Sequence, residues 1–81
     1  MEIYIITVRS VTYAQKTVGI LSENRIKSRI IKRPKGLDVG GCGYAVEVRT
    51  SRIGEVTSAL ADAALPDFKI YKRGRDGYVL F

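Results

Sequence analysis

The 81-residue chain contains no histidine, no tryptophan and a single cysteine, Cys42. The missing histidine removes the commonest general base and the commonest metal ligand, which disfavours a cysteine hydrolase and an intrachain zinc site. One cysteine cannot form an intrachain disulfide or a dithiol redox pair, and this favours a reducing, cytoplasmic setting. We therefore expect no metal and no cofactor, and a carrier or binding protein rather than a turnover enzyme.

Long apolar runs are also missing, since no stretch approaches the length of a membrane span. The chain opens without a basic region or a small-residue cleavage site, so we expect neither a signal peptide nor a membrane partner. Its length corresponds to one small domain covering residues 1–81, which is marginally stable because of its size. Fourteen basic against eight acidic residues give a net charge of +6, which favours an acidic partner such as nucleic acid or an acidic protein surface.

Apolar periodicity predicts the secondary structure. Strands are expected at 3–8, 25–32, 44–49 and 68–72, with helices capped by Ser10 and Ser51. This βαββαβ order predicts an α+β, ferredoxin-like domain whose antiparallel sheet has the order 4-1-3-2 and two helices on one face. The apolar tail 78–81 is predicted either to add a fifth strand or to pair with another chain, so a homodimer through the sheet or the tail stays open.

A glycine-rich loop at residues 33–43 surrounds the cysteine as Gly40-Gly41-Cys42-Gly43. Glycine allows close approach to the backbone, so the sulfur is expected to be reachable by a large partner. The predicted topology brings the loop to the same end of the sheet as the start of the first helix, whose N–H groups favour an anion. These features predict a reactive thiol with a lowered pKa. The alternative is a cysteine that is a small buried hydrophobe with a structural role.

A lone thiolate can accept a sulfur or selenium atom and pass it to another thiol. Redox sensing or glutathionylation fits the same features. In the carrier interpretation Cys42 holds the chalcogen, and its supporting residues are Gly41, Gly43, Ser10, Arg9, Tyr13, Arg33 and Lys35.

A basic run with no acidic residue spans Arg25 to Lys35 and suits either a solvated edge strand or a docking patch. Its candidate partner-binding residues are Arg29, Lys32 and Arg33. The alternative function is thus a binding module with a structural cysteine, acting through protein docking or RNA binding. RNA binding is less favoured, because Gly43-Tyr44-Ala45 resembles an RNA-recognition signature that then fails at Val46, where a second aromatic is expected.

Two segments, Ser10-Val11-Thr12-Tyr13-Ala14 and the Pro34 loop ending in Gly41-Cys42-Gly43, carry a family resemblance. Over about residues 3–72 the chain resembles the selenium/sulfur carrier protein-like family of small bacterial domains. The resemblance implies that Cys42 relays sulfur or selenium between a donor enzyme and an acceptor protein. Many members have histidine where this chain has Thr12 or Tyr13, which puts a proton-transfer role there in doubt. The sequence does not distinguish sulfur from selenium.

Overall fold

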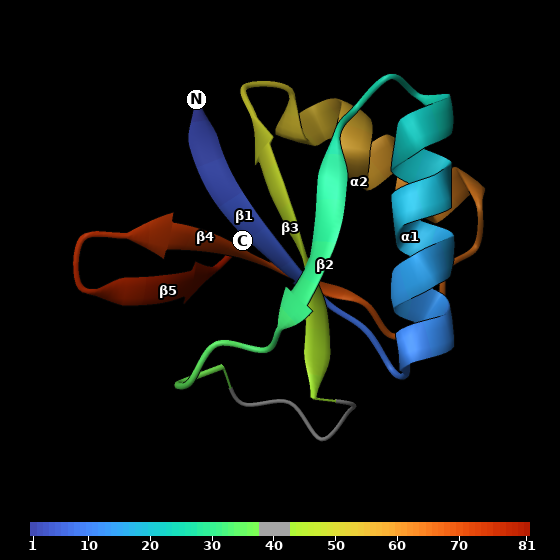
Figure 1. The fold of residues 1–81 in the computed structure, drawn as a ribbon. Helices are drawn as coiled ribbons and strands as arrows, with labels where there is room; N and C mark the ends of the chain where they lie inside the picture. Colours follow the sequence, from blue (N-terminus) through green and yellow to red (C-terminus); the bar gives the residue numbers. More distant parts are fainter. Residues whose placement is uncertain (38–42) are drawn as a thin grey trace.

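In a computed structural model, which describes residues 1–37 and 43–81, the chain forms two helices and five strands (Figure 1). Along the chain these are β1 (Glu2–Thr7), α1 (Val11–Glu23), β2 (Ser28–Lys32), β3 (Tyr44–Thr50), α2 (Ile53–Asp62), β4 (Lys69–Gly74) and β5 (Gly77–Leu80). All paired strands are antiparallel, and their order across the sheet is β2-β3-β1-β4-β5. Neither helix is long and apolar enough to cross a membrane, a finding that covers the described residues.

The α+β class predicted from the sequence is confirmed. Read from β4 toward β2, four strands follow the order 4-1-3-2, and β5 extends the sheet beyond β4. The layout therefore differs from a four-stranded ferredoxin-like sheet by this additional strand. The tail folds back on its own domain, where Phe81 N–H donates to the carbonyl of Ile70 at 2.8 Å.

The first helix begins and ends where the sequence predicts. The Ser10 hydroxyl accepts a hydrogen bond from the Tyr13 N–H at 3.4 Å, and the helix ends at Glu23 before Asn24. Its buried residues are Ala14, Thr17 and Leu21.

Three predicted boundaries are wrong, each for a local reason. The second strand begins at Ser28 rather than Arg25, because Arg25 takes a left-handed conformation with φ 61° that an extended strand does not allow. Ser51 does not cap α2; the helix starts after Arg52, whose N–H donates to the Thr50 hydroxyl at 2.9 Å. The fourth strand continues to Gly74, because β5 gives it a partner there.

One face of the sheet packs against both helices and forms the main core. It contains the alternate residues Tyr4 and Ile6 of β1 and Val8, which follows the strand, and all three are at most 5% exposed. The remaining members come from both helices and from β3, β4 and the connections, namely Ala14, Leu21, Ile26, Val46, Val48, Val56, Leu60, Leu65 and Ile70. Burial of these side chains supplies the main favourable term for folding.

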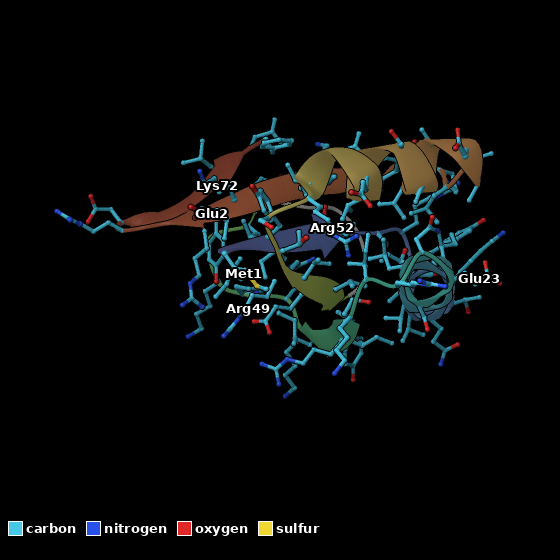
Figure 2. The ribbon with its side chains drawn as sticks, turned by 90° about the horizontal axis from the view of Figure 1, so that it is seen from above. Met1, Glu2, Glu23, Arg49, Arg52 and Lys72 are labelled. Atoms are coloured by element: carbon cyan, nitrogen blue, oxygen red, sulfur yellow. The ribbon has the colours of Figure 1, made fainter. Side chains whose placement is uncertain are left out.

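The face without helices carries a second, smaller cluster. Ile5 is 1% exposed and packs with Ala45 of β3 and with Leu37, which follows β2. Tyr71 and Tyr78 pack at its margin. In Figure 2 the labelled Arg49 lies away from both helices, on the side of this second face. Because β1 is buried on both sides, it is the central strand in packing as well as in pairing.

We expect Ile5→Ala to lower the free energy of unfolding by about 2–5 kcal/mol, the usual cost of truncating a buried isoleucine. Ile3→Ala on the same strand and face is the matched control, because Ile3 is only partly buried. Urea unfolding followed by circular dichroism measures both. Equal, small losses in the two variants would show that the second face is not packed.

Candidate functional site at the cysteine loop

The connection between β2 and β3 is held at both ends by backbone contacts. Lys32 pairs with Tyr44, and the Arg33 N–H donates to the Gly43 carbonyl at 2.8 Å, so the ladder extends one residue past each strand. Gly43 is exposed at this position. The residue that follows the cysteine is therefore fixed at the end of the sheet and open to solvent.

The first part of the connection folds onto the second face. The Leu37 N–H donates to the Pro34 carbonyl at 3.4 Å, and Gly36 takes a φ of 93°, a conformation in which glycine is favoured. This turn brings Leu37, which is 6% exposed, onto Ile5 and Ala45. The loop is thus anchored by a buried side chain as well as by its ends.

The loop and the start of α1 lie at the same end of the sheet, as the topology predicted. Thr7, the last residue of β1, pairs with Ala45 near the start of β3 and with Lys69 at the start of β4. Basic residues that adjoin these strand ends are Arg9, Lys32, Arg33, Lys35 and Lys69. We call this region, where β1 and β2 finish and β3 and β4 begin, the basic end.

The predicted supporting residues have defined contacts of their own. Arg9 forms an ion pair with Asp67 at 3.5 Å, in which both side chains are mostly exposed. Ser10 caps α1, and Tyr13 is partly buried against the main core. The first turn of α1 contains no acidic residue, so its N-terminal N–H groups keep their preference for an anion.

Cys42 and Gly41 lie outside the described residues, as do Asp38, Val39 and Gly40. The reactivity of the thiol and its approach to Arg9, Ser10, Arg33 or Lys35 stay predictions. The structure describes Gly43, the residue to which Cys42 is joined by a peptide bond, and the basic end that surrounds Gly43.

The residues predicted to bind a partner differ in their contacts and positions. Arg29 Nε donates to Glu47 Oε1 at 2.8 Å, and the two residues are directly opposite across β2 and β3. This pairing lowers the charge that Arg29 offers to a partner. Lys32 is exposed at the loop end of β2, so the basic end rather than the whole strand carries the docking prediction.

The register of β3 bears on the RNA-binding alternative. Val46 and Val48 are fully buried on the helix side, and alternation along the strand assigns Tyr44 to that side too. The position where an RNA-recognition signature requires a second exposed aromatic is therefore inside the core. The described strand does not offer the stacking platform of that class of domain.

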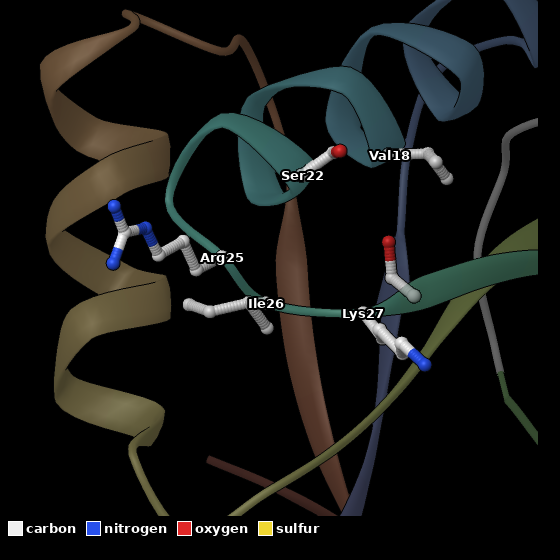
Figure 3. A pocket seen from close by; sticks show the side chains of 6 residues that line it. Val18, Ser22, Arg25, Ile26 and Lys27 are labelled. Carbon is white, nitrogen blue, oxygen red and sulfur yellow. The ribbon is translucent and has the colours of Figure 1, made fainter.

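A pocket of about 380 Å³ lies at the opposite end of the sheet, between the end of α1 and the start of β2 (Figure 3). Its lining residues are Val18, Ser22, Arg25, Ile26, Lys27 and Ser28. The Ser28 hydroxyl is the one buried side-chain polar atom without a hydrogen-bond partner in the described chain. None of the predicted site residues lines this pocket. No group of three or more potential metal ligands occurs within residues 1–37 and 43–81.

Sequence reasoning missed three residues that contact the predicted site residues or the loop. Leu37 anchors the loop, Asp67 pairs with Arg9, and Glu47 pairs with Arg29. A signal existed for Glu47, because it and Arg29 both alternate to the helix-free face of neighbouring strands. Leu37 and Asp67 lie in connections, where no periodicity indicates a partner.

The fold and the loop define a class: a small α+β domain whose single cysteine is joined to the exposed Gly43 between an edge strand and the next strand inward. The chain belongs to the family described as "Putative Se/S carrier protein-like", whose model matches residues 3–72. The match covers β1 through Lys72 of β4 and leaves β5 outside it. Searches of curated proteins and of solved structures returned no match.

We expect Leu37→Ala to speed tryptic cleavage after Lys35, because the protease needs local unfolding and the substitution weakens the contact that opposes it. Leu80→Ala is the control, since Leu80 is 60% exposed and lies far along the chain. Limited proteolysis with mass spectrometry locates the cut. Equal cleavage rates in the wild type and in Leu37→Ala would contradict the anchoring role.

Proposed function

We propose that this domain carries sulfur or selenium on Cys42 and transfers it between two partner proteins. The observation that carries the proposal is the exposed anchor at Gly43 within a basic end, in a chain that belongs to a selenium/sulfur carrier-like family. Cys42 is the one thiol of the chain, so any chalcogen relay through cysteine must use it.

Loading is an exchange between thiols that needs no added oxidant. The Cys42 thiolate attacks the outer sulfur of a persulfide on the donor protein, and a new S–S bond forms at Cys42. The inner S–S bond of the donor breaks, and the donor leaves as a thiolate with the bonding electron pair. Cys42 then bears the –SSH group with the proton that the donor's outer sulfur carried. Unloading repeats the step with an acceptor thiolate as the attacking group, and a selenopersulfide reacts in the same way.

Positive charge at the basic end supports this chemistry. Attack requires the thiolate, and nearby cations or helix N-termini favour that form over the thiol. Arg33 and Lys35 precede the cysteine in the same β2–β3 connection, while Arg9 and the start of α1 lie at the same end of the sheet. The proposed role of these groups is to hold negative charge on sulfur, both in the resting thiolate and in the loaded persulfide.

A carrier also has to release its cargo, and this explains why no base is needed at the site. The leaving thiolate departs without protonation when its own pKa is low. A chain without histidine can therefore load and unload, whereas a hydrolase of the same fold could not activate water. The partners would be a donor enzyme and an acceptor protein, approached through the exposed cations Lys32 and Lys35.

The direct test is intact mass spectrometry after incubation with a cysteine desulfurase and either cysteine or selenocysteine, so that the donor enzyme offers a persulfide or a selenopersulfide. The wild type is expected to gain one chalcogen atom, which a thiol reductant removes. Cys42→Ser is expected to gain nothing, because it lacks the accepting sulfur. Circular dichroism shows whether this variant is folded.

Two outcomes would refute the relay. One is a folded wild type whose Cys42 takes up no sulfur or selenium from any donor system. The other is uptake that an acceptor thiol cannot discharge, which would indicate a terminal modification instead of a carrier. Loading of Cys42→Ser at the wild-type level would show that the added atom is held elsewhere.

A further inference from the structure

The two edges of the sheet differ in how they are protected. The β2 edge carries Arg29 and Lys32, and charged side chains of this kind oppose pairing with another strand. The β5 edge, from Gly77 to Leu80, carries no lysine, arginine, acidic residue or proline. It exposes apolar side chains instead: Val79 is 66% exposed, Leu80 60% and the adjoining Phe81 61%. An exposed apolar edge of this kind is a template for a further strand.

Backbone groups on β5 point outward at two residues. Phe81 N–H bonds to Ile70, and Gly77 pairs with Gly74 at the hairpin turn, so the odd-numbered residues direct their backbone groups toward β4. Antiparallel ladders alternate in this respect. The N–H and C=O groups of Tyr78 and Leu80 are therefore directed away from β4, along the outer edge.

We propose that β5 pairs antiparallel with β5 of a second copy of this chain, in a two-fold arrangement centred on Val79. Tyr78 of each copy then lies opposite Leu80 of the other, and the two pairs exchange four backbone hydrogen bonds. Other two-fold registers place one outward residue opposite itself and give only two such bonds. Because the edge carries no charged side chain, this register brings no like charges together across the two-fold axis, and a second copy of the chain can occupy it.

The side chains match in this register. Val79 lies opposite its own copy on the helix side, where Phe81 packs edge-on against Tyr4 with ring centroids 5.5 Å apart. On the second face, Leu80 lies beside Tyr71 of its own chain and opposite Tyr78 of the other. Each face of the seam is thus apolar or aromatic, and the cations of β4 stay one strand away from it.

The turn end of the β5 edge is open to a partner, because the turn of the β4–β5 hairpin extends away from both helices (Figures 1 and 2). At the other end of β5, Thr57 of α2 lines a pocket together with Leu80 and Phe81, so α2 adjoins that end of the edge. The exposed apolar side chains at this edge are few, namely Val79, Leu80 and Phe81. The contact is therefore expected to bury less than about 1,200 Å² in total, in the class of weak, transient interfaces. The dimer is consequently expected to be dependent on concentration.

Sedimentation velocity from about 10 μM to about 1 mM covers the affinity range of weak interfaces. The wild type is expected to pass from monomer toward dimer. Val79→Lys and Val79→Glu are each expected to remain monomeric, because residue 79 faces its own copy and like charges repel. An equal mixture of the two variants is expected to dimerise again, because the opposed charges attract. Ile30→Lys, which changes an exposed apolar residue on the other edge, is the control and should dimerise like the wild type.

A second measurement fixes the register. In a Cys42→Ser background, Val79→Cys is expected to form a reducible covalent dimer under mild oxidation, because opposed residues in a non-hydrogen-bonded pair are close enough for a disulfide. Ile30→Cys in the same background is expected not to do so.

Three results would overturn the proposal: a wild type that is monomeric throughout the concentration range, charged Val79 variants that dimerise like the wild type, or a mixture that stays monomeric. If the wild-type chain binds an unrelated strand through β5 but does not dimerise, the dimer is wrong and the edge binds a different partner. None of these results depends on chalcogen loading, so the dimer and the carrier function succeed or fail separately.

Discussion

The burial of β1 on both faces is the constraint on which the rest of this domain depends. Ile6 is fully buried under the helices, and Ile5, its neighbour, is 1% exposed beneath the loop that follows β2. A strand with two buried faces and two paired neighbours leaves little freedom for the sheet around it. The start of β3 lies beside the end of β1 because the two strands pair antiparallel, and the start of α1 lies there because α1 follows β1 in the chain.

Much of this architecture could be predicted from the sequence, because it rests on local patterns. The run from Ile3 to Val8, the Ser10 cap and the alternation in β3 each indicate their structures without help from distant residues. The second face could not be predicted in the same way. Leu37 lies in a connection whose composition suggests only a turn, and its burial depends on Ile5 and Ala45 from other strands.

The candidate site was likewise only partly predictable from the sequence. Sequence spacing was enough to bring the loop and Ser10 to one end of the sheet, since topology alone requires it. The ion pair at that end was not predictable, because Asp67 lies in the connection before β4 and its exposed contact with Arg9 depends on the fold. The two edges consequently suit different roles: the end of the basic β2 edge adjoins the cysteine loop, while the uncharged β5 edge lies across the sheet.

The most direct test of the central claim, a reactive Cys42 thiolate, is the pH dependence of its alkylation in the folded protein and in denaturant. A reactive thiolate is expected to show an apparent pKa in the folded protein clearly below about 8.5, the value of a free thiol, and a return to that value on unfolding. A folded-state pKa at or above the denatured value, with slow alkylation, would contradict it. That result would make Cys42 a packing residue.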